Sequence, residues 1–162
     1  MMPTKTAIDT ILTVEHPAPG VSVVALSRPP LNPISWQMDR DLLRVLQGLG
    51  RDESVSVVIV RGAGERAFSV GADIHEMRRV AAEGRAKTRL RFENVVFDTL
   101  ERLPQPTIAA IEGRALGGGF ELALCCDFRI LGSSATLGLP EIKLGVFPGS
   151  GGMMRLARIV GE

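Results

Sequence analysis

The chain has 162 residues, of which 45% are hydrophobic and 23% charged, a composition typical of one globular domain and unlike that of a disordered or fibrous chain. Nineteen Lys and Arg against eighteen Asp and Glu give a formal net charge of +1, so no global field favours nucleic acid or an anionic membrane as a partner. Two adjacent cysteines and two histidines provide neither a disulfide framework nor a metal-ligand spacing, and we expect no metal site.

The start of the chain shows no targeting or membrane-spanning pattern. Lys5 and Asp9 interrupt the stretch in which a signal peptide would be apolar. No apolar run in the sequence reaches the roughly 18 residues that span a bilayer. We therefore expect a cytoplasmic protein without a membrane partner.

The first third of the chain predicts a β-α-β unit. Residues 11–15 and 21–26 have the pattern of two strands, and residues 16–20 between them predict a wide loop rather than a tight hairpin turn. Ser35 is a candidate helix N-cap, because apolar residues recur after it with the spacing of one helix face. The continuous β-branched run at residues 57–60 is typical of a strand covered on both faces, as in a parallel sheet.

The rest of the chain alternates glycine-rich turns with helix and strand patterns. Residues 62–73 are too rich in glycine for regular structure and form a candidate ligand loop. The remaining predicted elements are, in order, a long helical region with Phe92, Val96, Leu100 and Leu103 on one face, a strand at 107–111, a glycine turn at 113–119, a helix at 120–126, a strand at 128–131 and a helix at 153–160. This alternation predicts an α/β layered fold.

The triple glycine Gly117-Gly118-Gly119 stands directly before the helix at 120–126. Bare peptide N–H groups at a helix N-terminus favour an anion or oxyanion site. The alternative is a glycine hinge that permits close packing between strand and helix. Glu121 lies one turn into this apolar helix, where a carboxylate is either a surface residue stabilised by the helix dipole or a group directed at a ligand.

A second carboxylate, Glu141, follows Pro140, with the glycine cluster around Gly149 a few residues later. Two carboxylates beside one oxyanion site could share a water molecule and perform acid and base chemistry near neutral pH. The alternative for Glu141 is an exposed glutamate at a helix start. Sequence spacing alone does not show whether the two glutamates meet.

Competing motifs fail on their residue patterns. The triple glycine lacks the third glycine of a dinucleotide fingerprint, and neither glycine cluster precedes the Lys-Ser or Lys-Thr pair of a phosphate-binding P-loop. Both histidines precede Ser150, which is the wrong order for an α/β-hydrolase triad. Cys125 and Cys126 lie in an apolar helix and are interpreted as inert buried thiols. Asp127 is interpreted as a structural turn or cap residue.

Six basic residues and one acidic residue occur between Arg78 and Arg91. This pattern usually indicates a solvated helix face. The alternative is a rim that attracts a phosphorylated cofactor, because the stretch follows the loop around Asp73.

Three blocks together, residues 67–74, 111–123 and 139–152, resemble the enoyl-CoA hydratase/isomerase (crotonase) superfamily, and residues 28–32 extend the match. The resemblance implies a spiral of repeated β-β-α units, with residues 1–162 forming the crotonase-like core domain. It also implies that the chain is truncated before C-terminal helices that complete the acyl pocket and the homotrimers or hexamers of the family. For the short chain alone we expect weak activity and association through exposed apolar residues.

The resemblance implies roles for individual residues. Glu121 and Glu141 would be the catalytic pair, and the peptide N–H groups of Val70 and Gly118 would form the oxyanion hole. The residues implied for coenzyme A and substrate binding are Leu26, Arg28, Ala72, Asp73, Ile74, Gly117 and Gly149.

Both glutamates are present, which favours an enoyl-CoA hydratase acting on an acyl-CoA thioester without a separate cofactor. An isomerase, another crotonase-type CoA enzyme, and a non-catalytic binding protein of the same fold are the alternatives. Turnover of crotonyl-CoA would separate them.

Overall fold

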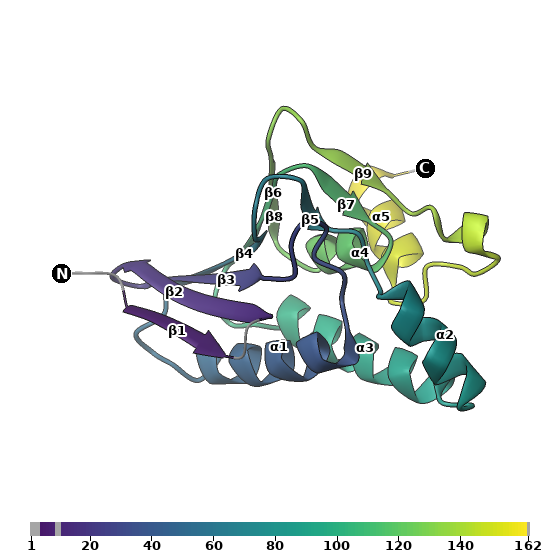
Figure 1. Cartoon of the computed structure of the whole chain (residues 1–162). Helices are drawn as coiled ribbons and strands as arrows, with labels where there is room; N and C mark the ends of the chain where they lie inside the picture. The colour runs from purple at the N-terminus through teal and green to yellow at the C-terminus, as the bar shows by residue number, and fades with distance from the viewer. Residues whose placement is uncertain (1–3, 9–10, 162) are drawn as a thin grey trace.

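The computed structural model describes residues 4–8 and 11–161 and contains two sheets (Figure 1). The larger sheet has six strands in the order β1-β2-β3-β4-β6-β8, and the smaller has three in the order β5-β7-β9. The strands are β1 (Thr4–Ile8), β2 (Leu12–Ala18), β3 (Val21–Leu26), β4 (Val57–Gly62), β5 (Ala67–Ser69), β6 (Thr107–Ile111), β7 (Arg114–Leu116), β8 (Phe128–Leu131) and β9 (Thr136–Gly138).

The described residues also form five α-helices and one short 3-10 helix, of which the last two, η1 and α5, follow the final strand. They are α1 (Trp36–Leu49), α2 (Ile74–Ala82), α3 (Ala86–Glu101), α4 (Gly118–Leu124), η1 (Glu141–Leu144) and α5 (Gly152–Val160). In Figure 1, α1 and α3 run along one side of the larger sheet, and η1 lies at the far edge of the molecule. Helix α4 lies between the smaller sheet and α5.

A long strand, a short strand and a helical segment recur in this order along the chain. The units are β4-β5-α2, β6-β7-α4 and β8-β9-η1, and both β4-β6-β8 and β5-β7-β9 are parallel arrays. The expected spiral of β-β-α units is therefore confirmed. The loops predicted at 62–73 and 113–119 contain β5 and β7, whose three residues each are too short to show a periodicity in the sequence.

The turn between β2 and β3 is tighter than predicted. Ala18 pairs with Val21, so only Pro19 and Gly20 connect the strands, and Gly20 has a φ of +75°. The prediction of a wide loop is wrong because β2 continues through residues 16 and 17 as an irregularity in the register. A bulge of this kind places an extra residue in one strand without opening the hairpin.

The predicted helices are present with shifted ends. Ser35 caps α1 by accepting a hydrogen bond from the Met38 N–H. The long helical region is two helices, α2 and α3, separated near Gly84, which has a φ of +68°. Helix α4 begins at Gly118, two residues before its predicted start.

The core lies between the larger sheet and the helices, and the largest fully buried side chains include Phe68, Phe97 and Leu122. Asp127 is structural, as predicted: its carboxylate accepts hydrogen bonds from the N–H and hydroxyl of Thr107 at 2.8 Å each. Both cysteines are buried, and desolvation raises the pKa of Cys126 to about 12. This thiol is therefore protonated at neutral pH.

We predict that Gly119→Ala destabilises the fold by at least about 2 kcal/mol through overpacking. A Cβ at Gly119 would lie 2.3 Å from the Ser69 carbonyl oxygen, and backbone cannot move aside as a side chain can. Gly48→Ala in α1 is the matched control, because a Cβ there meets no atom within 4 Å. Alanine is more favourable than glycine inside a helix by up to about 1 kcal/mol, so the control is expected to be neutral or stabilising. Urea unfolding compares the two, and equal stabilities would contradict the packing argument.

Candidate active site

The first turn of α4 packs against the loop that follows β5. A Cβ on Gly71 would lie 2.8 Å from the Gly118 nitrogen and 2.9 Å from the Leu116 carbonyl oxygen, and Gly71 has a φ of +85°. Glycine is therefore required at this position on two grounds. The contact places the N–H groups at the start of α4 beside the start of α2, where the ends of both helix dipoles are positive.

The structure does not support the predicted oxyanion donor at Val70. The Val70 N–H donates to the Leu31 carbonyl at 3.1 Å and is therefore occupied. Two residues later, the Ala72 nitrogen lies 3.7 Å from the position of a Cβ on Gly118. Within the described residues, neither Ala72 nor Gly118 has a hydrogen-bond acceptor for its N–H. Ala72 and Gly118 therefore offer a pair of free donors, in which Ala72 takes the place predicted for Val70.

Glu121 is buried at the end of this turn, with 3% of its surface exposed. Its Oε1 atom accepts hydrogen bonds from the N–H groups of Ser150 at 2.9 Å and Gly152 at 2.8 Å. Desolvation raises the pKa of Glu121 to about 7, against the opposing effect of these two donors. The nearby carboxylates of Glu93 and Glu141 also raise it. Glu121 can therefore both take and release a proton near neutral pH.

Glu141 is the first residue of η1, and its carboxylate lies against the triple glycine. A Cβ on Gly117 would be 3.2 Å from the Glu141 Oε1 atom. Both carboxylate oxygens are buried and have no hydrogen-bond partner among the described residues. Because Glu141 also acts electrostatically on Glu121, the fold brings together the two glutamates that are 20 positions apart in the sequence.

Glu93 is a third carboxylate of this region, which the sequence analysis did not single out. Its Oε1 atom lies 3.1 Å from the position of a Cβ on Gly118. Arg89, four residues earlier on α3, forms an ion pair with it at 3.2 Å. Arg89 and Glu93 lie on the same buried helix face as Val96 and Leu100. This spacing in the sequence could have indicated that both charged side chains are buried.

The residues implied for coenzyme A binding fall into two groups. Arg28 pairs with Asp73 at 2.9 Å, and Asp73 caps α2 by accepting from the His75 and Glu76 N–H groups. Leu26, in contrast, is fully buried and its carbonyl accepts from the Ala63 N–H, so a direct ligand contact from Leu26 is not supported.

Of the other implied residues, Ala72 and Gly117 lie beside the start of α4, and Ile74 and Gly149 lie apart from each other. Ile74 is 44% exposed at the start of α2. Gly149 lies against α3, where its carbonyl accepts from the Asn94 side chain at 3.3 Å.

The basic stretch from Arg78 to Arg91 is not uniformly a solvated face. Arg79 is exposed and pairs with Glu76 and Glu83, as expected for such a face. Arg89, however, is buried and forms a second ion pair, with Asp39 of α1. A charge inside the helix pair is stable only because oppositely charged groups meet it there.

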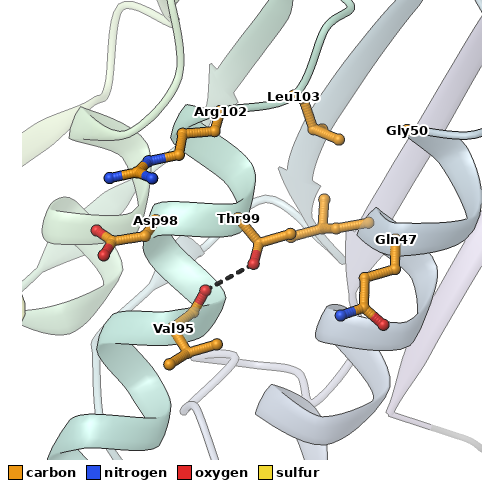
Figure 2. Close-up of a pocket in the computed structure, with 8 residues that line it drawn as sticks. Gln47, Gly50, Val95, Asp98, Thr99, Arg102 and Leu103 are labelled. Carbon is orange, nitrogen blue, oxygen red and sulfur yellow. Dashed lines mark hydrogen bonds between the residues drawn. The ribbon is translucent and has the colours of Figure 1, made fainter.

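A cavity of about 420 Å³ lies between α1 and α3 (Figure 2). Gln47 and Gly50 line one side of this cavity, and Val95, Thr99 and Leu103 are among the residues on the other. None of the predicted site residues lines it.

Across the described residues, no helix is both long and apolar enough to cross a membrane.

Comparison with known proteins places this arrangement in a family. The family model described as enoyl-CoA hydratase/isomerase matches residues 17–162. The chain belongs to this enoyl-CoA hydratase/isomerase family. A short-chain-enoyl-CoA hydratase of Clostridium acetobutylicum is 46% identical over 143 residues, which cover 87% of this chain and 54% of that protein. A putative enoyl-CoA hydratase/isomerase of Bacillus subtilis is 42% identical, with 88% and 55% covered.

Solved structures of the family show the same fold. A crystal structure of an enoyl-CoA hydratase from Bacillus anthracis superposes with a TM-score of 0.89 at 40% identity, covering 94% of this chain and 59% of that one. A structure from Geobacillus kaustophilus gives 0.91 at 34% identity, covering 99% and 60%. The chain therefore spans little more than half the length of the curated relatives it matches.

Because burial raises the pKa of Glu121 to about 7, protonation of this residue is linked to stability. A carboxyl with a raised folded-state pKa contributes stability below its unfolded pKa and loses it as pH rises through the folded value. We predict that Glu121→Gln, which retains an acceptor for the two N–H groups, stabilises the protein about 2 kcal/mol more at pH 8 than at pH 5. Urea unfolding of parent and variant at both pH values measures this difference, and an equal effect at both would contradict it.

Proposed function

We propose that the protein that contains this chain is an enoyl-CoA hydratase, which adds water across the 2,3 double bond of a trans-2-enoyl-CoA. The observation that carries the proposal is the meeting of Glu121 and Glu141 beside the free N–H groups of Ala72 and Gly118. Acid–base groups and oxyanion donors are both needed for this reaction, because a proton moves while negative charge develops on the thioester oxygen. The names of the relatives support the same activity.

The donors stabilise the enolate-like transition state. We assign the oxyanion hole to the N–H groups of Ala72 and Gly118, each worth about 3 kcal/mol to the transition state. Gly118 is the first residue of α4, so the helix dipole adds to its N–H. The donors are fixed by backbone packing before substrate arrives, so they do not need to reorient during the reaction.

The two glutamates handle the protons. Glu121 orients the water and takes its proton as the hydroxyl oxygen bonds to C3, and Glu141 delivers a proton to C2. The added water supplies the hydroxyl group, and the proton that Glu121 takes from it replaces the one that Glu141 gives to C2 when it passes between the two carboxyl groups, so the pair is restored. A water bridging both carboxylates would let them share these roles. The reaction requires neither a metal nor a redox cofactor, and the coenzyme A is part of the substrate.

The start of α2 supports binding of the coenzyme A part of the substrate. Arg28 and Asp73 fix the N-terminus of α2 next to Ala72 and the exposed Ile74, and we propose that the adenine lies along this edge. Cytoplasmic location and assembly into trimers or hexamers stay predictions. Exposed apolar side chains on η1, on the loop that follows it and on α5, including Phe147 in the loop and Met154 on α5, support an interface there.

We predict that Glu121→Gln and Glu141→Gln each lower hydration of crotonyl-CoA at least about a hundredfold while leaving thioester binding largely intact, because an amide retains the shape but cannot transfer the proton. Loss of the conjugated thioester absorbance measures hydration in the complete gene product. Glu53→Gln, an exposed glutamate in the α1–β4 loop, is the matched control. Parent-like turnover in either variant would remove that glutamate from the mechanism, and conversion of 3-enoyl substrates alone would favour an isomerase.

For the oxyanion hole, we predict that Gly118→Pro is less active than Gly118→Ala by about a hundredfold. Both substitutions add a Cβ near Glu93, but only proline removes the N–H donor. Proline is tolerated at the first position of a helix, so the comparison does not require the helix to break. Circular dichroism verifies folding, and similar turnover in the two folded variants would show that this N–H does not stabilise the reaction.

A further inference from the structure

Glu93 lies in the interior of the site although it belongs to α3. It is 6% exposed, and its Oε1 atom approaches the α-carbon side of Gly118, where a Cβ would be 3.1 Å away. A carboxylate that is this deeply buried requires compensating partners. Its surroundings come from three elements: α1, the preceding turn of α3, and the segment before α5.

Arg89 and Asp39 provide the charge environment of Glu93. Arg89 pairs with Glu93 at 3.2 Å and also with Asp39 of α1, so one guanidinium faces two carboxylates. Burial, and then the charge of Glu93, raise the pKa of Asp39 well above its usual range, while Glu76 and Arg40 act on it more weakly. Burial also raises the pKa of Glu93, but Arg89 and the Ser150 hydroxyl oppose this effect. One guanidinium thus serves both carboxyl groups, and burial opposes the ionisation of each.

Ser150 connects Glu93 to Glu121. Its peptide N–H donates to Glu121 at 2.9 Å, and its hydroxyl lies close enough to Glu93 to lower the pKa of that carboxyl group. Next to it, the Gly149 carbonyl accepts from the side chain of Asn94, the neighbour of Glu93 on α3. On the other side, the Arg155 guanidinium donates to the Ser150 carbonyl at 2.6 Å. Residues 149–152 are thus held against α3 at the point where they bind the Glu121 carboxylate.

We propose that Glu93 is a positioning residue of this site: it holds Ser150 in place and keeps a fixed negative charge beside Glu121, and so sets the pH at which Glu121 exchanges its proton. This inference rests on the proposed function for its role in turnover. Electrostatics supports the geometry, since Glu93 acts on Glu121 more strongly than Glu141 does. A neighbouring negative charge favours the protonated form of a carboxyl group.

The test compares Glu93→Gln with Asp39→Asn, which remove the two carboxylates that share Arg89. The pKa of Glu121 is read by ¹³C NMR of glutamate-labelled gene product, with its signal assigned from the Glu121→Gln variant. We expect Glu93→Gln to lower this pKa by at least about 0.5 unit. Asp39→Asn removes the other carboxylate that pairs with Arg89, on α1, and is expected to leave the pKa of Glu121 within about 0.2 unit because Asp39 is not among the groups that act on Glu121. The corresponding limb of the pH profile of kcat/KM for crotonyl-CoA is expected to move with it.

Equal shifts in both variants, or none in Glu93→Gln, would overturn the proposal, because the effect would then come from disrupting the ion cluster as a whole. If Glu93→Gln does not fold, Ser150→Ala replaces it as the test, since it removes the hydroxyl and keeps the peptide N–H. We expect this variant to lose several-fold in kcat with KM unchanged, and parent-like kcat would overturn the positioning role. A pKa shift in a protein without hydratase activity would overturn the proposed function but not the role of Glu93 beside Glu121.

Discussion

Backbone contact between the segment after β5 and the first turn of α4 is the constraint on which the rest of this site depends. At Gly71 and Gly119 a hydrogen atom occupies the place where any side chain would overlap the opposing backbone. This approach leaves two peptide N–H groups, from different β-β-α units, free in the same region. It also fixes Glu121 one turn later in α4, so donors and carboxylate are positioned by one packing contact. Close-packed interiors transmit small displacements, so this geometry is set by the fold and not by loop conformation.

The three carboxyl groups beside this contact have different surroundings. Glu121 accepts two peptide N–H groups, Glu93 meets a guanidinium and a hydroxyl, and Glu141 has no hydrogen-bond partner among the described residues. Burial places them where charges are weakly screened, and the charges of Glu93 and Glu141 raise the cost of ionising Glu121. This explains why Glu121 has a pKa close to neutral although two donors favour its anion. The site thus obtains an acid–base group from an ordinary glutamate by crowding and desolvation.

The residues of α3 link the helical layer to this chemistry. Arg89 joins α3 to α1 through Asp39, and Glu93, on the same face one turn later, reaches α4 and the segment before α5. An ion pair in the interior contributes little net stability, but it fixes the groups that form it. The packing of α3 on α1 is therefore coupled to the position of residues 149–152.

Local patterns in the sequence were sufficient for much of this description. The Ser35 cap, the apolar faces of α1 and α3 and the β-branched run of β4 depend on neighbouring residues, and each was predicted near its observed position. The triple glycine and the two glutamates were identified as site candidates because their chemistry is visible in the residue types. Together with the block at residues 67–74, the blocks that contain these residues also carried the family resemblance.

The sequence could not determine what depends on a partner far along the chain. Strands β5, β7 and β9 exist because they pair with one another, and three residues are too few to show that pairing. We assign the donor to Ala72 and not to Val70 because the Leu31 carbonyl, 39 positions from Val70, accepts the Val70 N–H. Glu93 joins the site because its side chain extends from α3 to Gly118 at the start of α4, a contact between segments that share no local pattern. The sequence by itself thus determined which elements and reactive groups the chain contains, and only the tertiary structure decided which peptide groups stay free and which carboxylates meet, because nonlocal hydrogen bonds and burial fix both.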